Sequence, residues 1–327
     1  MASILFIGGT GQISLPCVHE AVAAGHKVSV LNRGKTNVDV PKGVSIIVGD
    51  MDDDATYSQL GDGKFDVVCQ FRAYTAAQMK KDIATFSGKT GQYVFISSAS
   101  AYQKPAQHYI ITEKTPLVNP FWEYSRNKIA CETMLREQSG LPYTIVRPSH
   151  TVRTGMPLAI GDGDAVARRL LRGAPVIVHG DGTSLWTVTR CADFAVPFVR
   201  LLGNAKALGD DFQITNDRAF TWDEITNGIA AGLGVEAQIV HVPSDTLIRY
   251  NKEWEGPLLG DKSWSALFDN AKIKGLVGDF TCAQDLPTIL EDSIANFKAR
   301  NAGHDQSPHA LDALMDRICA EQAKLGT

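Results

Sequence analysis

The first thirty residues constrain the fold most, because a glycine-rich turn stands between a short apolar run and a helical pattern. Residues 3–7 are typical of a buried strand, and the segment 8–14 (Gly-Gly-Thr-Gly-Gln-Ile-Ser) follows at once. A helix is expected over residues 15–24, ended by Gly25, and a second strand over residues 27–31. This order of strand, glycine turn, helix and strand predicts the first unit of a parallel α/β sheet.

The glycine turn itself predicts a phosphate-binding loop. Gly8 permits the tight turn, and Gly11 lets the backbone approach a pyrophosphate at the N-terminus of the helix. Ser14 stands where a third glycine is usual, and its small side chain still allows the helix to pack closely on the strand. An ordinary turn before a helix is the alternative interpretation. The predicted cofactor contacts of the loop are Gly8, Gly11, Gln12 and Ile13.

The rest of the chain continues the alternation of strand and helix patterns. Further strands are expected at residues 44–48, 65–70, 92–97 and 143–147, with helices between them that include residues 75–87 and 121–138. Such alternation predicts an α/β fold with a Rossmann-type doubly wound parallel sheet. After residue 148 the pattern loosens, and we expect helices at 164–172, 191–203 and 221–233 and short strands at 176–178 and 212–215.

Composition and charge exclude several classes of protein. With 327 residues, 44% of them hydrophobic, the chain is long enough for one large domain or two smaller ones. The net charge of −4 and the pI near 6.1 provide no cationic surface for nucleic acid. No apolar run reaches the ~18 residues of a membrane span, and the first strand begins too early to leave room for a signal peptide.

The cysteine and histidine patterns give further expectations. Six cysteines are scattered without a Cys-x-x-Cys pair, which is typical of reduced packing residues in a cytoplasmic protein. No metal-ligand cluster is visible among the eight histidines, so no metal site is expected.

Tyr124 and Lys128 lie four positions apart within a predicted helix. That spacing places both side chains on one face of the helix. A nearby ammonium group favours the phenolate and is expected to lower the pKa of the phenol towards neutrality. The pair therefore predicts a proton donor or acceptor, whereas an amphipathic helix surface is the alternative.

The strand at 92–97 ends in a run of hydroxyl side chains. Ligands of open α/β sheets bind beyond the carboxyl ends of the strands. Ser98 or Ser100 is therefore expected to hydrogen-bond a substrate oxygen beside Tyr124. A serine-rich turn without such a role is the alternative.

Together these motifs resemble an extended short-chain dehydrogenase/reductase of the NAD-dependent epimerase/dehydratase family. The resemblance covers roughly residues 3–300, and its matching pieces are the loop 8–14, Gly49-Asp50-Met51, the segment 97–102, Tyr124-x-x-x-Lys128, Arg147-Pro148, Gly180-Asp181-Gly182 and Asp193. It implies that Ser98, Tyr124 and Lys128 are catalytic, with Lys128 also holding the nicotinamide ribose.

The resemblance also implies how the chain is organised. Residues 1–150 are expected to form the dinucleotide-binding domain, and residues 151–300 a smaller substrate-binding lobe interleaved with the main sheet. Residues 301–327 are expected to form a linker and a last helix, at about 308–324, that packs as an appendage. Relatives of this kind are often homodimers, joined through the helix that bears Tyr124 and its predecessor.

The end of the second strand bears on the choice of cofactor. NAD-specific relatives usually carry an acidic residue there, whereas this chain has Asn32, Arg33 and Lys35. Two cations without a carboxylate favour the 2′-phosphate of NADP, and NAD is the alternative because Asn32 can still bind a ribose hydroxyl. The resemblance further implies that Asp50 and Met51 bind adenine and that Phe71 and Pro148 lie beside the cofactor. Arg72 is interpreted equally as a phosphate or acid contact and as a surface residue.

The substrate residues are less well defined by the resemblance. Sugar dehydratases of the family place Asp and Glu where this chain has Ala99 and Ser100, which weakens a dehydratase reading. Trp186 occupies about the place of an arginine that relatives aim at a substrate diphosphate. The candidate substrate contacts are Ser98, Ser100, His150, Arg153 and Trp186, with a packed structural role as the alternative for His150 and Trp186.

The function implied is hydride transfer at a hydroxyl or keto carbon of a sugar-like small molecule by an NAD(P)-dependent oxidoreductase or epimerase. Two alternatives remain open. One is an NADPH-dependent reductase of a small carbonyl compound, and the other is a non-catalytic relative that senses nucleotides or binds RNA. The intact set of Ser98, Tyr124 and Lys128 argues against lost catalysis, and the acidic pI argues against RNA.

Overall fold

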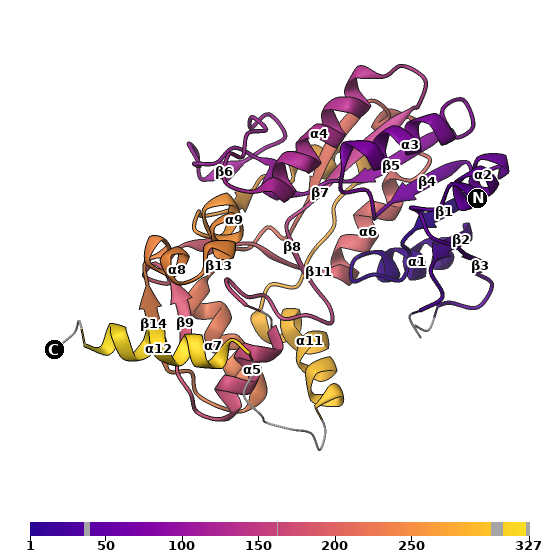
Figure 1. The fold of residues 1–327 in the computed structure, drawn as a ribbon. Helices are drawn as coiled ribbons and strands as arrows, with labels where there is room; N and C mark the ends of the chain where they lie inside the picture. Colours follow the sequence, from indigo (N-terminus) through magenta and orange to yellow (C-terminus); the bar gives the residue numbers. More distant parts are fainter. Residues whose placement is uncertain (36–39, 162, 302–309, 325–327) are drawn as a thin grey trace.

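The computed structural model describes residues 1–35, 40–161, 163–301 and 310–324. Its centre is a parallel sheet of seven strands in the order β12-β7-β5-β4-β1-β2-β3 (Figure 1). The strands are β1 (Ser3–Ile7), β2 (Lys27–Asn32), β3 (Ser45–Val48), β4 (Val67–Gln70), β5 (Gln92–Ile96), β7 (Tyr143–Pro148) and β12 (Asp210–Ile214). This arrangement confirms the predicted doubly wound α/β fold.

Helices cover both faces of the sheet (Figure 1). One face is covered by α1 (Ser14–Ala23), α6 (Cys191–Leu201) and α10 (Ala271–Val277), which contribute Cys17, Phe194 and Ile273 to the core. The other face is covered by α2 (Asp54–Asp62), α3 (Ala76–Phe86) and α4 (Glu123–Glu137), which contribute Tyr57, Met79 and Leu135 to the core. The inner strands β1, β4, β5 and β7 are buried on both faces, as expected for a parallel sheet, whereas the edge strand β3 is largely exposed.

The lobe is built from short strand pairs and helices around a third apolar core. Its pairs are β8 (His150–Val152) with β11 (Val188–Arg190), β9 (Val176–His179) with β14 (Ile239–Val242), β10 (Leu185–Trp186) with β13 (Phe220–Thr221), and β6 (Ile110–Ile111) with β15 (Leu267–Phe268). Its helices are α5 (Gly163–Leu171), α7 (Trp222–Leu233), α8 (Ser244–Tyr250), α9 (Glu255–Pro257), α11 (Leu286–Arg300) and α12 (Asp312–Ala323).

Short helical turns complete the chain. Three of them are 3₁₀ turns, η1 (Ala99–Ala101), η2 (Ala205–Ala207) and η3 (Lys252–Trp254), and η4 (Leu258–Lys262) is a π-helical turn. Turns of the π type inside helical segments occur frequently at functional sites.

Chain direction explains why the two halves interleave. After β7 the chain enters the lobe through β8 and returns through α6 and β12, which pairs in parallel with β7. Strand β12 belongs to the main sheet, and α6 packs on one face of that sheet. The domain boundary near residue 150 stays a prediction.

The C-terminal helix packs on the lobe. Met315 and Ile318 of α12 are buried in the lobe core, so this helix is an integral part of the lobe and not an appendage. The predicted linker at 301–309 lies, apart from Asn301, outside the described residues.

Several smaller expectations can be compared with the structure. Thr221 caps α7 through a capping box with Glu224, which confirms that Trp222 opens a helix. All six cysteines are free, and five of them are buried. No helix in the described part of the chain is long and apolar enough to cross a membrane.

Candidate active site

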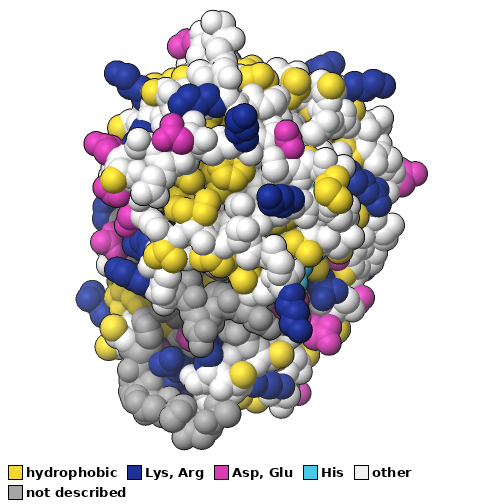
Figure 2. All heavy atoms as spheres, turned by 90° about the vertical axis from the view of Figure 1, so that its right-hand side faces the viewer, with side chains coloured by type: hydrophobic (Ala, Val, Ile, Leu, Met, Phe, Trp, Pro, Cys, Tyr) yellow, Lys and Arg dark blue, Asp and Glu magenta, His cyan; other side chains and the backbone are white. Residues whose placement is uncertain are grey.

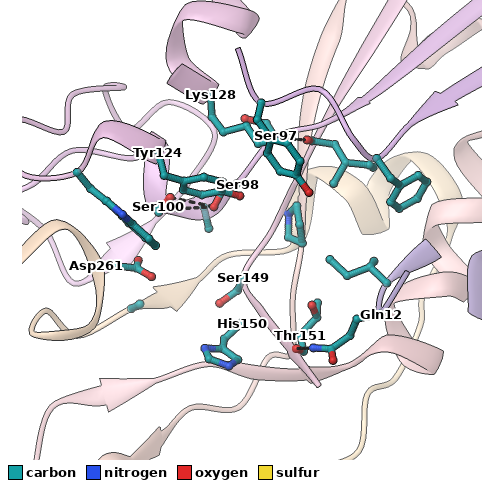
Figure 3. Close-up of a pocket in the computed structure, with 18 of the residues that line it drawn as sticks. Gln12, Ser97, Ser98, Ser100, Tyr124, Lys128, Ser149, His150, Thr151 and Asp261 are labelled. Carbon is teal, nitrogen blue, oxygen red and sulfur yellow. Dashed lines mark hydrogen bonds between the residues drawn. The ribbon is translucent and has the colours of Figure 1, made fainter. Parts of the chain in front are cut away.

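A cavity of about 580 Å³ opens where the carboxyl ends of β1, β4, β5 and β7 face the lobe (Figure 3). Ligands of this fold class bind at that edge of the sheet. Its walls include the glycine loop, the hydroxyl run after β5, the first turns of α4 and the π-helical turn η4. The predicted site residues on these walls are Gly8, Gly11, Gln12, Ile13, Phe71, Ser98, Ser100, Tyr124, Lys128, Pro148, His150 and Trp186.

Ser14 locks the shape of the glycine loop. Its hydroxyl donates to the carbonyl of Gly8 at 2.6 Å and accepts from the amide of Gly11 at 2.9 Å. Gly8 adopts φ +82°, which favours glycine, and a Cβ there would lie 2.3 Å from Cγ of Arg72. The loop therefore needs glycine at position 8 for both backbone conformation and space, and the serine at position 14 has a bonding role beyond small size.

Two further side chains hold this loop against the lobe. The Gln12 amide donates to the carbonyl of Thr151 at 2.8 Å, and its oxygen accepts from the amide of Gly155 at 3.1 Å. The Arg153 guanidinium donates to the carbonyls of Gln12 and Gly11. Arg153 thus lies against the glycine loop and is not among the residues that line the cavity, and its expected role as a substrate contact stays a prediction. Sequence could not place Arg153, because β8 carries it back to a loop far away in the chain.

A second cavity, of about 200 Å³, adjoins the first one and shares Gly8, Gly11 and Arg72 as walls. Its lining includes the five residues predicted to bind the adenosine end of the cofactor, Asn32, Arg33, Lys35, Asp50 and Met51. Arg33 and Lys35 are exposed at its mouth. The locked loop, the open first turn of α1 and this adjoining cavity fit an extended dinucleotide.

Tyr124 and Lys128 lie on α4 and face the end of β5 (Figure 3). The Lys128 ammonium is buried and donates to the carbonyls of Ala73 and Ile96, each at 2.8 Å. It lies 5.9 Å from the centre of the Tyr124 ring. The structure therefore brings Ser98, Tyr124 and Lys128 to one wall of the cavity.

The pKa values of this pair differ from the sequence expectation. Burial raises the pKa of Tyr124 to about 12, although a hydrogen bond with Ser98 opposes the rise. Burial also lowers the pKa of Lys128 to about 8. The expected lowering of the phenol pKa by Lys128 is thus wrong for the protein alone, because desolvation of the phenolate outweighs a cation whose donors bond backbone carbonyls.

Three serine hydroxyls form a chain behind Tyr124. Ser125 on α4 donates to Ser100 at 2.8 Å, and the Ser100 and Ser98 hydroxyls are 2.9 Å apart. Ser100 and Ser125 are buried, whereas Ser98 is partly open to the cavity. Ser100 therefore orients Ser98 from the side away from the cavity. Of the three hydrogen-bonded hydroxyls, that of Ser98 is open to the cavity.

His150 and Trp186 line the side of the cavity opposite Tyr124. Burial, and next the charge of Lys262, lower the pKa of His150 to about 3, so its ring is neutral at physiological pH. The buried indole of Trp186 packs against Trp222 with ring centres 5.3 Å apart, and its edge meets His150. Among the described residues, neither the Trp186 indole N–H nor the Ser97 hydroxyl has a hydrogen-bond partner.

The helix that carries Tyr124 and Lys128 is anchored by a buried ion-pair network. The Arg147 guanidinium of β7 donates to both carboxylate oxygens of Glu132 on α4, at 2.8 and 2.5 Å. It also bonds Asp211 of β12 at 2.5 Å and the Tyr102 hydroxyl at 3.1 Å. Because Glu132 lies one helical turn beyond Lys128, this network fixes the position of Tyr124 and Lys128 on the sheet.

Several lining residues were missed by sequence reasoning. They come from segments without a recognisable motif, and they are Tyr74, Lys104, Trp122, Ser149, Asp261 and Lys262. Trp122 alone had a local signal, since it directly precedes the helix of Tyr124, and its ring lies 5.0 Å from the Tyr124 ring. The residues of η4 are far from the other site residues in the sequence and reach the site only through the tertiary fold. One contact that holds η4 there is the hydrogen bond from the Asn119 side chain to the carbonyl of Gly260, at 2.7 Å.

Comparisons with known proteins agree with this geometry. Residues 4–215 match the model of the NAD dependent epimerase/dehydratase family. The chain is 25% identical to 2′-dehydrokanamycin reductase of Streptomyces kanamyceticus, over 81% of this chain and 76% of that protein. It is 29% identical to the chloroplast stem-loop binding protein of 41 kDa b of Arabidopsis thaliana, over 73% of this chain and 65% of that one.

Solved structures show the same fold. UDP-glucose 4-epimerase of Bifidobacterium longum, determined in complex with NAD+ and UDP, superposes with a TM-score of 0.71 at 17% identity, covering 92% of this chain and 99% of that one. At that identity the likeness concerns the fold, whereas the family match covers most of the chain. The chain is therefore an enzyme of the NAD-dependent epimerase/dehydratase family, within the extended short-chain dehydrogenases/reductases.

Proposed function

We propose that this enzyme transfers hydride at a hydroxyl or keto carbon of a sugar-like small molecule. The observation that carries the proposal is the meeting of Ser98, Tyr124 and Lys128 on one wall of a cavity whose other end is the glycine loop. The nicotinamide of the bound cofactor supplies or accepts the hydride. Tyr124 exchanges a proton with the reacting oxygen, and Ser98 positions that oxygen by a hydrogen bond.

The protonation state of Tyr124 favours one direction of the reaction. A phenol with a pKa near 12 is neutral at pH 7 and is ready to donate a proton to the oxygen of a carbonyl that receives hydride. Acting as a base on a hydroxyl would first require loss of that proton. A reductase of a carbonyl compound is therefore the second candidate, and the name of the Streptomyces relative adds support.

The cofactor proposed is NADP, with NAD as the alternative. Arg33 and Lys35 at the mouth of the adenosine cavity suit a 2′-phosphate, and the described lining of that cavity offers one carboxylate, Asp50. Arg33→Ser should weaken NADP binding by about 10- to 100-fold, the value of one or two charged hydrogen bonds, and leave NAD binding unchanged. The exposed Arg249→Ser serves as the control, and equal affinity of the unmodified protein for NAD and NADP would refute the preference.

Two measurements test the function itself. First, the purified protein is denatured and any released nucleotide is identified. Stoichiometric retention through dialysis favours an epimerase that regenerates its cofactor, whereas an empty protein favours a reductase with an exchanging cofactor. Second, Tyr124→Phe should lower kcat on keto sugars or nucleotide sugars by roughly 10²- to 10⁴-fold and leave cofactor affinity unchanged. Full activity of Tyr124→Phe would refute the assignment.

The remaining expectations stay predictions. They are a homodimer joined through α3 and α4, a cytoplasmic location, and the absence of nucleic-acid binding. The last of these bears on the Arabidopsis relative, which is named for binding a stem-loop. In Figure 2, Lys and Arg side chains on the face shown are interspersed with Asp and Glu, which does not favour a phosphate backbone there. Salt-sensitive retention of RNA on a filter would revive that alternative.

A further inference from the structure

Three charged side chains from two distant segments line the active-site cavity away from the glycine loop. Lys104 follows η1, whereas Asp261 and Lys262 end the π-helical turn η4. Figure 3 shows Asp261 near Tyr124 and Ser100, with Gln12 of the glycine loop at the other end of the pocket. Asp261 therefore lies at the end of the cavity away from the glycine loop, and its charge acts on both lysines.

One of the three groups is buried and two are half-buried, and none of them is directly neutralised. Lys104 is 3% exposed, and Asp261 and Lys262 are half-buried. In the described part of the chain, neither ammonium group nor the carboxylate has a hydrogen-bond or ion-pair partner within 4 Å, although Lys262 lies 5.5 Å from the centre of the Trp122 ring. Burial lowers the pKa of both lysines and raises that of Asp261, while Asp261 acts on both lysines in the opposite direction.

The balance of these charges indicates the kind of ligand. When all three groups are ionised, the cluster carries one net positive charge. Lys128 cannot serve it, because its ammonium already donates to two backbone carbonyls. A neutral ligand would leave the excess charge unpaired in a medium of low dielectric constant, whereas an oxyanion would neutralise it and accept hydrogen bonds from both ammonium groups. Asp261 then remains as an acceptor for a hydroxyl group.

We propose, on the basis of the function proposed above, that the substrate carries an oxyanion bound by Lys104 and Lys262 and a hydroxyl bound by Asp261. The substrate class is therefore a polyhydroxylated acid, with the oxyanion supplied by a carboxylate, a phosphate or a diphosphate. The nicotinamide end of the cofactor must share the same 580 Å³, which favours a compact molecule such as a sugar acid or a sugar phosphate.

Calorimetric titration of the full-length Tyr124→Phe variant with saturating NADP tests this proposal without turnover. The probes are gluconate, glucose 6-phosphate, UDP-glucose and, as the neutral match, glucose. At least one anionic probe should bind at least tenfold more tightly than glucose. Which probe does so identifies the carboxylate, phosphate or diphosphate as the source of the oxyanion.

Variants of the lysines connect the binding to the cluster. Lys104→Met and Lys262→Met should each weaken binding of the anionic probe by tenfold or more and leave NADP affinity unchanged, since neither residue is among the predicted cofactor contacts. Lys206→Met, an exposed lysine outside the cavity, should change neither affinity. Lys104→Gln and Lys262→Gln repeat the test with polar side chains should a methionine variant fold poorly.

The outcomes separate the two proposals. If no anionic probe binds more tightly than glucose to the NADP-loaded protein, or if the lysine variants bind it unchanged, the oxyanion proposal is wrong. If the protein binds neither NADP nor NAD, the proposed function itself fails, and this appears in the cofactor titration before any probe is added.

Discussion

Two groups of buried charge lie near the active site, and they are built in opposite ways. Around Arg147 every charge is paired, because the guanidinium contacts Glu132 and Asp211 and Arg136 completes the outer side. Around Lys262, among the residues that the structure describes, the charges of Lys104 and Asp261 are near but not in contact.

This difference distinguishes buried charges that stabilise the fold from buried charges that do not. A buried ion is costly to desolvate, and the fold recovers that cost only through close partners with good geometry. The Arg147 network does so while it joins α4, β7 and β12. The Lys104–Asp261–Lys262 group borders a cavity instead, so its partners must come from a ligand or from water. The predictions below measure this contrast as a free energy of unfolding.

The largest effect is expected for Arg147→Met. Removing the guanidinium leaves the buried Glu132 with only the longer contact to Arg136, at 3.7 Å, which should destabilise the fold by about 3–5 kcal/mol. Urea unfolding at pH 7 measures the loss. The matched control is Arg136→Met, because Arg136 is partly exposed and should contribute no more than about 1 kcal/mol. Equal losses for the two variants would contradict the contrast.

The next effect concerns Asp82 of α3, a buried carboxyl that is bonded by neutral donors. Tyr57 and Tyr93 donate to it at 2.6 Å each, and Gln70 at 2.7 Å. Burial nevertheless raises its pKa from 3.8 to about 6. The folded state therefore holds this proton more tightly than the unfolded state does, so the contribution is fully present below pH 3.8 and is lost as the pH rises through 6.

Asp82→Asn should reveal this loss. The asparagine cannot ionise and does not lose this contribution. The free energy of unfolding of the variant, relative to that of the unmodified protein, should therefore rise by up to about 3 kcal/mol between pH 4 and pH 7. Urea unfolding of both proteins at several pH values in that window gives the difference. A difference that does not vary with pH would show that neutral donors stabilise this charge as well as Glu132 is stabilised by Arg147.

The same contrast separates what sequence could predict from what it could not. The glycine loop, the strands of the main sheet and the spacing of Tyr124 and Lys128 are local patterns, and local geometry follows from them. The architecture around Arg147 was visible only as the motif Arg147-Pro148, because its partners come from α4 and β12. Lys104 and Lys262 had no signal, since a charged residue in a loop is usually solvated.

Burial was the quantity that sequence could not provide. It reverses the expected direction of the Tyr124 pKa, it makes His150 neutral, and it turns Trp186 into a packed wall of the cavity. Arg153 shows the other limit, because its target is the backbone of a loop and not a side chain with a recognisable pattern.

A smaller loss is expected for Arg169→Met in the lobe. Arg169 is buried and pairs with Asp312 and Asp316 of α12, but Asp316 is exposed and Asp312 keeps Arg172 as a partner. The carboxylates left behind are better compensated than Glu132, because Asp316 is solvated and Asp312 keeps its 2.8 Å contact with Arg172, so the cost should be about 2 kcal/mol. Urea unfolding measures the cost, and faster proteolysis at α12 should accompany it. If Arg169→Met loses as much stability as Arg147→Met, the ion-pair partners left to the carboxylates do not determine the loss of unfolding free energy.

The smallest effect is expected for Lys262→Met, and its sign matters more than its size. If the ammonium has no direct partner in the protein alone, removing it relieves desolvation and should leave stability unchanged or raise it by up to about 1 kcal/mol. Lys272→Met is the control, because Lys272 bonds Asp210 at 2.6 Å and its removal should cost up to about 1 kcal/mol. A cost above 1 kcal/mol for Lys262→Met would place this charge with the Arg147 network, as part of the architecture. A gain in stability combined with weaker binding of an anionic probe would instead mark Lys262 as a charge that the fold keeps for its ligand.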